Sequence, residues 1–285
     1  MKRATSPVIS VALLTRNGGE SLSDVLDVLA EQICSWPHEV VAVDSGSTDG
    51  TLEALERAKA RVYSIKPSDF RFGPTRQYCF SLTRGKVIVT VSQDAVPIGK
   101  DWLQRMVEPI LVGQYDIVQG SEQLTSDTCF SWERRGQFYF ASPYRHWTGK
   151  RPMLLGVCLA ISRAAWEQTG FGDVPMSEDL LLAIKADSLG LRVKRPDDLL
   201  VAHGHTYTLI SLAKRSFNEG MGARFTEGKY SLVQMFRDIC RPKLWRWTIA
   251  LALRREIGSP AEILFFAVRP LMLYIGFQFG RNYWH

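Results

Sequence analysis

The sequence predicts an α/β protein with a mostly parallel central sheet flanked by helices, followed by a helical C-terminal extension. Three observations lead to this fold class. The 285 residues are 46% hydrophobic and 22% charged, which suits a large globular core. From residue 8 to about residue 92, short β-branched runs alternate with amphipathic stretches, as in a parallel sheet covered by helices. Beyond His205 the periodicity is helical.

Four strands and three helices are expected in the first part of the chain. The strands cover residues 8–14, 39–44, 61–65 and 87–92, and the helices cover about residues 21–32, 51–59 and 75–82. The first helix has Ser21 available as its N-cap. Its apolar face follows the spacing i, i+3, i+4, i+7 and consists of Leu22, Val25, Leu26 and Leu29. This arrangement is typical of a nucleotide-binding half-domain.

The middle of the chain is less regular. A helix near residues 100–112 and a strand near residues 116–123 are followed by residues 126–153, which are rich in aromatic and arginine residues. That mixture suits either core packing or an acceptor that carries sugar or lipid phosphate. The remaining predicted elements are a strand at 155–161, a helix at 178–188, strands near 192–195 and 199–203, and helices at 209–220, 232–240, 244–257 and 260–277.

Basic charge is concentrated at the C-terminal end. Residues 241–285 hold seven Lys or Arg against two Glu, a net charge of +5 out of +6 for the whole chain. The nearly neutral remainder disfavours a nucleic-acid binder. The apolar run at 263–277 has about 15 residues and contains Arg269-Pro270, whereas a membrane span needs roughly 20. We expect no transmembrane helix. The basic, aromatic helices either lie on an anionic membrane surface or pack on the rest of the protein.

The cysteines and the N-terminal residues predict a cytoplasmic protein. Five cysteines are widely spaced without a C-x-x-C pair, which is typical of a reducing compartment. The first apolar run is interrupted by Thr15-Arg16-Asn17-Gly18-Gly19 before any cleavage site, so we interpret it as a strand and not as a secretory signal.

An acidic motif follows the second predicted strand. Residues 44–51 read Asp-Ser-Gly-Ser-Thr-Asp-Gly-Thr. Open α/β sheets bind ligands at the carboxyl ends of parallel strands, where Asp44 could accept hydrogen bonds from a base or a ribose. A capped strand–turn–helix connection without a ligand explains the same residues equally well.

Asp94 and the pair His203-Gly204-His205 also follow predicted strands. Carboxylate oxygens suit a hard divalent cation, and imidazole is acceptable when that cation is manganese. The alternative is a helix-capping aspartate and histidines that are exposed or simply packed.

Glu178-Asp179 opens the helix predicted at 178–188. Acidic residues in a first helical turn can merely complement the helix dipole. A carboxylate at the edge of a ligand site can also deprotonate a hydroxyl group.

Taken in order, these motifs resemble the family 2 glycosyltransferases of the GT-A fold, which is Rossmann-like. The resemblance covers about residues 7–225 and rests on Thr15-Arg16-Asn17-Gly18-Gly19, residues 43–51, Phe72-Gly73-Pro74-Thr75-Arg76-Gln77, Ser92-Gln93-Asp94-Ala95, Ser177-Glu178-Asp179 and His203-Gly204-His205. Bacterial rhamnosyltransferase-like enzymes of surface-polysaccharide synthesis are the most similar branch. The resemblance implies a domain at 1–225, with a nucleotide-sugar half at about 7–97 and an acceptor half at about 98–225. Residues 226–285 remain as the helical extension.

The resemblance also implies a role for each site residue. The nucleotide of a UDP- or dTDP-sugar, dTDP-rhamnose among the candidates, would be held by Thr15, Asn17, Asp44, Ser45, Arg76, Ser92, Gln93 and Arg215. For Arg215, a solvated position on a helix is an equally good interpretation. Mn²⁺ or Mg²⁺ would be held on the diphosphate by Asp94, His203 and His205.

Catalysis would depend on the acidic pair. Asp179, beside Glu178, would act as the general base that deprotonates the acceptor hydroxyl, and transfer would invert the anomeric carbon. The acceptor would be a lipid-linked or cell-surface glycan, which the protein would meet on the inner face of the cell membrane. No nucleic acid is expected as a partner.

Three departures from the family pattern bear on function. The D-x-D motif is reduced to Ser92-Gln93-Asp94, and F-x-H-G-x-T-R-N appears as Phe70-Arg71-Phe72-Gly73-Pro74-Thr75-Arg76-Gln77. The missing Q-x-x-R-W motif favours transfer of one sugar per acceptor. The alternatives are a sugar-phosphate nucleotidyltransferase, whose glycine- and arginine-rich loop is not evident, and a non-catalytic, membrane-associated nucleotide-sugar-binding protein.

Overall fold

The chain divides into two compact units in its computed structural model, which describes residues 6–124, 143, 154–205, 207–257 and 259–282. The first unit comprises the described residues of 1–123, 151–173 and 179–203, and the second comprises those of 124–150, 174–178 and 204–285. Apart from Pro143, the aromatic segment predicted at 126–153 lies outside the described residues.

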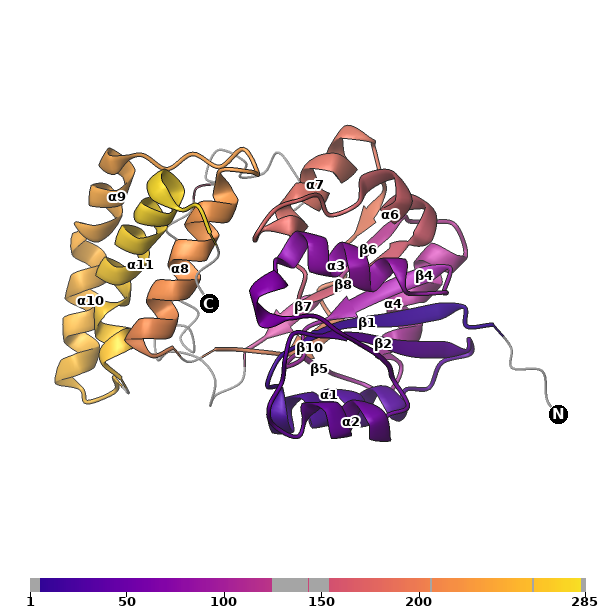
Figure 1. Ribbon diagram of the computed structural model, residues 1–285. Coiled ribbons are helices and arrows are strands. Elements are labelled where there is room, and N and C mark those ends of the chain that lie inside the picture. Colours follow the sequence, from indigo (N-terminus) through magenta and orange to yellow (C-terminus); the bar gives the residue numbers. More distant parts are fainter. Residues whose placement is uncertain (1–5, 125–142, 144–153, 206, 258, 283–285) are drawn as a thin grey trace. The chain divides into compact units, whose positions relative to one another are not determined.

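Seven strands form the central sheet of the first unit, in the order β3-β2-β1-β4-β8-β6-β9. They are β1 (Ile9–Thr15), β2 (His38–Asp44), β3 (Arg61–Ser64), β4 (Val87–Val91), β6 (Ile117–Gln119), β8 (Cys158–Ser162) and β9 (Val193–Lys194). Strands β3, β2, β1 and β4 are parallel neighbours, whereas β8 is antiparallel to β4 and β6. The prediction of a mostly parallel sheet is confirmed (Figure 1).

Helices cover both faces of this sheet because its strands are apolar on both sides. Along β1, Val11 and Leu13 belong to one buried cluster and Ala12 belongs to the other. The first cluster packs against α1 (Gly19–Ala30), α2 (Thr51–Arg57) and α4 (Trp102–Leu111). The second packs against α3 (Phe72–Ser81), α6 (Arg163–Thr169) and α7 (Glu178–Ser188). A 3₁₀ turn, η1 (Pro67–Asp69), precedes α3.

A second, three-stranded sheet in the order β5-β10-β7 completes the first unit. It contains β5 (Val96–Pro97), β7 (Ser121–Gln123) and β10 (Leu200–Ala202). The single strand predicted at 116–123 is therefore wrong, because the chain leaves the large sheet at Gly120 and enters the small one. A Cβ atom at Gly120 would lie 2.2 Å from Cys158 Sγ, so only glycine permits this crossing.

The start of α1 also differs from its prediction. Ser21 is not the N-cap, since α1 begins at Gly19 and Gly18 occupies the cap position without a side-chain bond. The loop after β2 supplies the missing acceptors. The N–H of Gly18 donates to Thr51 Oγ1 and the N–H of Gly19 donates to Asp49 Oδ2, at 2.8 and 3.0 Å. A neighbouring loop thus caps this helix.

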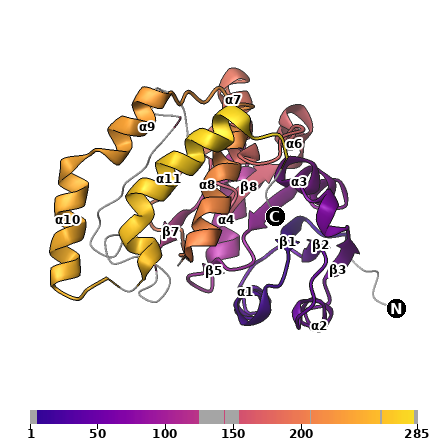
Figure 2. The same cartoon turned by 60° about the vertical axis from the view of Figure 1, so that its left-hand side comes forward.

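The second unit contains α8 (Leu209–Ala223), α9 (Leu232–Ile239), α10 (Pro242–Leu253) and α11 (Pro260–Phe279). Thr208, Ser231 and Ser259 precede three of these helices, and each side chain accepts a backbone N–H three residues further on. Apolar side chains from all four helices, including Phe265 and Phe266, share one core. Figures 1 and 2 show α8, α9 and α10 around α11.

Glycine brings α8 and α11 unusually close together. A Cβ atom at Gly220 would lie 2.0 Å from the Leu273 carbonyl oxygen, and one at Gly276 would lie 1.9 Å from that of Phe217. This packing ties α8 to the C-terminal helices. In the last part of the chain, the second compact unit therefore begins after His203, whereas the family resemblance implied a boundary at residue 225.

The helix predicted at 260–277 is confirmed as α11, which continues through Pro270. Arg269 Nη1 lies 2.7 Å from Glu219 Oε2 on α8, so its charge is paired within the unit. By length and composition alone, Ala261–Phe279 is apolar enough to cross a membrane, although one third of its most apolar part is buried within the protein. Core helices of soluble proteins can have the same length and composition.

Candidate active site

The candidate site of the first unit begins at the carboxyl ends of β1 and β2. Asp44, the last residue of β2, is buried and accepts four hydrogen bonds. The hydroxyls of Thr15 and Ser47 donate to its Oδ2 at 3.0 and 2.5 Å, and the N–H groups of Gly46 and Ser47 donate to its Oδ1 at 3.0 and 2.9 Å. A carboxylate has about four acceptor positions. To accept from a base as predicted, Asp44 would have to release one of these donors.

Asn17 fastens the loop after β1 to the loop after β2. Its N–H donates to Ser47 Oγ at 2.8 Å, and its Oδ1 accepts from the N–H of Thr48 at 2.9 Å. Its φ of 46° is left-handed, a conformation that asparagine tolerates better than most residues. Asp49 adds to this connection, accepting from Gly19 with one oxygen and from Thr51 with the other. The two predicted nucleotide loops are therefore a single bonded structure.

Ser45 and Arg76 are buried in the same unit. Ser45 donates its N–H and its hydroxyl to the Thr15 carbonyl, at 2.9 and 3.2 Å. Arg76, on α3, donates to Thr90 Oγ1 on β4 at 2.5 Å, and its guanidinium lies 5.9 Å from the ring centre of Phe171. These contacts hold both residues inside the unit, and their contact with a nucleotide stays a prediction.

The shortened D-x-D motif uses its middle residue to join two loops. Gln93 accepts from the N–H of Arg16 at 2.9 Å and donates to the Arg16 carbonyl at 3.0 Å. Ser92 donates its N–H to the Val157 carbonyl, beside β8. A glutamine amide can make this reciprocal pair because it carries both a donor and an acceptor, whereas an ionised carboxylate only accepts. The turn that presents Asp94 is thereby anchored to the loop after β1.

Asp94 and His203 are brought together by the small sheet. Asp94 precedes β5, His203 follows β10, and these two strands pair with Val96 opposite Ala202. His203 Nε2 lies 3.4 Å from Asp94 Oδ1. One ligand atom from each of Asp94, His203 and His205 falls within 4.8 Å of the others. One carboxylate and two imidazoles are a donor set that a divalent cation such as Mn²⁺ accepts.

Glu122 is a further acidic neighbour of His203 that no sequence motif predicted. It lies on β7, which is parallel to β10, and its Oε2 is 3.5 Å from His203 Nδ1. Burial by itself lowers the pKa of His203, but hydrogen bonding and negative charge from Asp94 and Glu122 outweigh it and raise the pKa to about 9. No motif marked Glu122, because only the pairing of β7 with β10 brings it to the histidine.

Asp179 lies at the start of α7. Its Oδ2 accepts from the N–H of Gly156 at 2.9 Å, and its Oδ1 accepts from the N–H of Leu180 at 2.8 Å. These bonds orient a carboxylate beside the chain that enters β8. Glu178, which is buried, and Arg215, on α8, belong to the second unit. Arg215 Nε bonds Glu219 Oε1 at 2.9 Å, and its guanidinium lies 5.7 Å from the Tyr207 ring centre.

The fold has solved counterparts. A mannosyltransferase from Pyrobaculum calidifontis, in complex with GDP-Man and Mn²⁺, is 18% identical with a TM-score of 0.58, and the match covers 96% of this chain and 86% of that one. Glucosyl-3-phosphoglycerate synthase from Mycobacterium tuberculosis, in complex with Mn²⁺, UDP and glucosyl-3-phosphoglycerate, is 22% identical with a TM-score of 0.56. That match covers 73% of this chain and 75% of that one. These likenesses support the GT-A fold.

Comparison with protein families points in the same direction. No curated protein matches the chain. The family model for glycosyl transferase family 2 matches residues 10–170, which include the loops after β1, β2 and β4 and the strand β8. This match favours a glycosyltransferase over a sugar-phosphate nucleotidyltransferase. The chain belongs to glycosyl transferase family 2.

Proposed function

We propose that this glycosyltransferase moves one sugar from a UDP- or dTDP-sugar to a hydroxyl group of a glycan acceptor, with inversion and with a divalent cation on the diphosphate. The observation that carries the proposal is the cluster of Asp94, His203 and His205, which begins at the carboxyl end of β4, the sheet end where open α/β proteins bind ligands. The bonded loops of Thr15, Asn17 and Asp44 lie at the same end of the sheet and would hold the nucleoside.

The donor set fits the proposed cation. Asp94 supplies a hard oxygen ligand and the histidines supply nitrogen ligands, a combination suited to Mn²⁺ and, with more retained water, to Mg²⁺. When bound, such a cation stabilises the negative charge of a departing diphosphate. The Mn²⁺ complexes of the two structural counterparts support this assignment.

Asp179 is the proposed general base. Backbone N–H groups of Gly156 and Leu180 each bond one of its oxygens, so the carboxylate has a defined orientation. Such a group can take the proton from an acceptor hydroxyl as the oxygen attacks the anomeric carbon. Glu178, the preceding residue, is proposed to support the same step.

The donor base and sugar need a direct test. The sequence resemblance favours UDP or dTDP and makes rhamnose a candidate sugar, whereas the structural counterparts include a GDP-Man complex and a UDP-glucose complex. The donor panel must therefore include all three nucleotides.

A membrane-surface acceptor is part of the proposal. Four large apolar side chains of α9 and α10 are more than half exposed, namely Val233, Phe236, Ile249 and Leu253. Basic residues on the same helices would attract an anionic leaflet. We propose a cytoplasmic protein that is peripheral on the inner face of the cell membrane, where lipid-linked or cell-surface glycan precursors are met. Flotation with anionic but not neutral vesicles supports this, and no flotation with either contradicts it.

A thermal-shift screen tests the core of the proposal. UDP, dTDP, GDP and CMP are added with and without Mn²⁺, and a ligand at 100 times its dissociation constant should stabilise the protein by about 2.7 kcal/mol. We expect a Mn²⁺-enhanced shift for UDP or dTDP. A shift with GDP alone would change the donor assignment. If no nucleotide gave a shift, the proposed glycosyltransferase activity would be contradicted.

A further inference from the structure

His203 is held between two carboxylates. Its Nε2 lies 3.4 Å from Asp94 Oδ1 and its Nδ1 lies 3.5 Å from Glu122 Oε2, while the residue is only 5% exposed. The three residues come from three separate places in the chain, the turn after β4, the strand β7 and the end of β10. The opposite edges of one imidazole therefore face two different acidic groups.

The two carboxylates cannot have the same role toward a metal-binding histidine. A neutral imidazole offers one lone pair and one N–H, and the partner of the N–H decides which nitrogen can bind a metal. A carboxylate on the non-ligating nitrogen fixes the tautomer and the ring orientation. Glu122 faces Nδ1, so a proton held there leaves the Nε2 lone pair directed toward Asp94.

The small sheet keeps Glu122 in this place. Val201 of β10 is the register partner of Glu122 on β7, and the N–H of His203 donates to the Gln123 carbonyl at 3.0 Å. The backbone bond on His203 extends the ladder by one residue beyond β10. The separation of the two side chains is therefore set by backbone pairing and not by a flexible loop.

We propose that Glu122 is the positioning residue of the metal site: it holds the proton on His203 Nδ1 and directs Nε2 toward a divalent cation that Asp94 also binds. This role rests on the proposed function, because the cation is the one assigned there. Glu122 itself acts through the histidine.

Direct Mn²⁺ binding tests this role without any measurement of transfer. Electron paramagnetic resonance of unbound Mn²⁺ gives the affinity of the full chain, without nucleotide, for the wild type, E122A, E122Q and the charge-matched control E108Q. Glu108 lies exposed on α4. We expect E122A to bind Mn²⁺ about 10- to 100-fold more weakly. E122Q should lose distinctly less Mn²⁺ affinity, since its amide oxygen still accepts from Nδ1–H, and the affinity of E108Q should stay within about twofold of wild type.

The outcomes separate this inference from the proposed function. If the wild type binds Mn²⁺ and E122A binds it equally well, Glu122 has no positioning role, although the metal site stands. Equal losses in E122A and E122Q would show that charge and not orientation matters, which also overturns the role. Failure of the wild type to bind Mn²⁺ would overturn the metal site and this inference together.

A measurement on the wild type alone covers the case in which E122A does not fold. Long-range ¹H–¹⁵N NMR of the Mg²⁺-loaded protein reports which nitrogen of His203 carries the proton. Protonation at Nδ1 supports the proposal, and protonation at Nε2 overturns it.

Discussion

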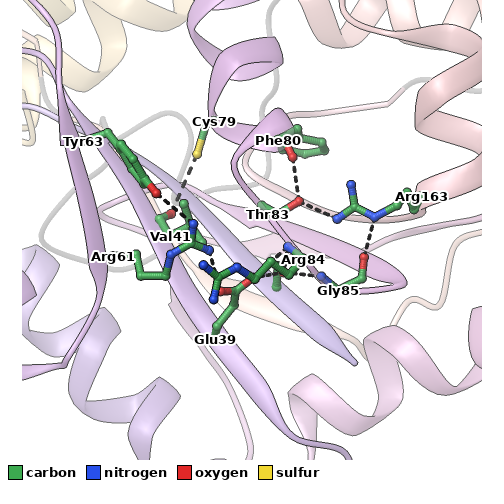
Figure 3. Close-up of polar contacts among 11 residues, drawn as sticks. Glu39, Val41, Arg61, Tyr63, Cys79, Phe80, Thr83, Arg84, Gly85 and Arg163 are labelled. Carbon is green, nitrogen blue, oxygen red and sulfur yellow. Dashed lines mark hydrogen bonds and ion pairs between the residues drawn. The ribbon is translucent and has the colours of Figure 1, made fainter. Parts of the chain in front are cut away.

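The two ends of the central sheet in the first unit handle acidic residues in different ways. At the amino ends of the strands, Glu39 meets a permanent cation, because its Oε2 lies 2.8 Å from Arg61 Nη1 (Figure 3). Its Oε1 accepts from Ser10 Oγ and from the N–H of Arg84, each at 2.8 Å. At the carboxyl ends, Asp94 and Glu122 meet an imidazole, whose charge depends on pH.

The amino ends of the strands are also closely packed. Arg163, after β8, donates to the Gly85 carbonyl and to Thr83 Oγ1, both at 2.8 Å (Figure 3). A Cβ atom at Gly85 would lie 2.6 Å from the Ser10 nitrogen, so the chain passes against β1 where only glycine fits. A charge matched by a guanidinium stabilises the fold under ordinary conditions. A histidine between two carboxylates can instead exchange its proton for a metal ion.

Of the changes at either end of the sheet, replacement of Asp179 by Asn should have the largest effect. The amide can still accept a backbone N–H but cannot take a proton, so transfer should fall by about 10²–10⁴-fold while nucleotide binding is retained. The rate of nucleoside-diphosphate release, measured with the donor that passes the thermal-shift screen, checks this. The exposed D24N variant on α1 is the control. Near-normal turnover of D179N would remove Asp179 from the mechanism.

When no metal is bound, the fold should lose stability in alkali because His203 loses its proton. The folded pKa of His203 is raised to about 9 from an ordinary value of 6.5. The protonated form therefore stabilises the fold fully below pH 6.5, and this contribution, roughly 3 kcal/mol, is lost as the pH rises through 9. Urea unfolding of wild type and H203Q with EDTA should show a free-energy gap that shrinks over this range. A gap that does not change with pH contradicts the prediction.

Glu39 should respond in the opposite direction and by less. Burial raises the pKa of this carboxyl, but bonds from Arg61, Ser10 and Arg84 outweigh it and hold the pKa below its ordinary value of 4.5. Its stabilisation is therefore present above pH 4.5 and is lost as the pH falls through the lowered pKa.

The E39Q variant measures this contribution. It leaves the half-buried Arg61 without its counter-charge, so unfolding free energy at neutral pH should fall by about 2 kcal/mol. The difference from wild type should shrink in acid, and the nucleotide dissociation constant should stay unchanged. The exposed E31Q variant is the control for charge removal. Weaker nucleotide binding in E39Q alone would show that the two ends are coupled.

The local pattern of the sequence predicted the first half of the sheet well. Strands β1 to β4 and helices α1 to α3 lie within a few residues of their predicted positions, because burial on both faces requires continuous β-branched runs and amphipathic helices between them. The same reasoning placed Asp44 and Asp94 at strand ends. The family resemblance then assigned them chemistry, and the match to glycosyl transferase family 2 confirmed the family.

Tertiary structure decided how these residues are used. The sequence marked Asp44 as a ligand-binding group, but the folded loops give it four internal donors. Gln93 looked like the loss of a carboxylate, yet its amide joins two loops. Neither role is visible in a local pattern. The bonds of Asp44 join the end of β1 to the loop after β2, and those of Gln93 join the loop after β1 to the loop after β4.

The sequence by itself therefore determined the elements, the end of the sheet where the chemistry lies, and the family. Only the tertiary structure split residues 116–123 between two sheets and set Glu122 against His203. The physical reason is the separation along the chain over which each effect acts. Periodicity reports which face of one element is buried, whereas strand pairing and glycine-mediated close approach join residues that are tens of positions apart.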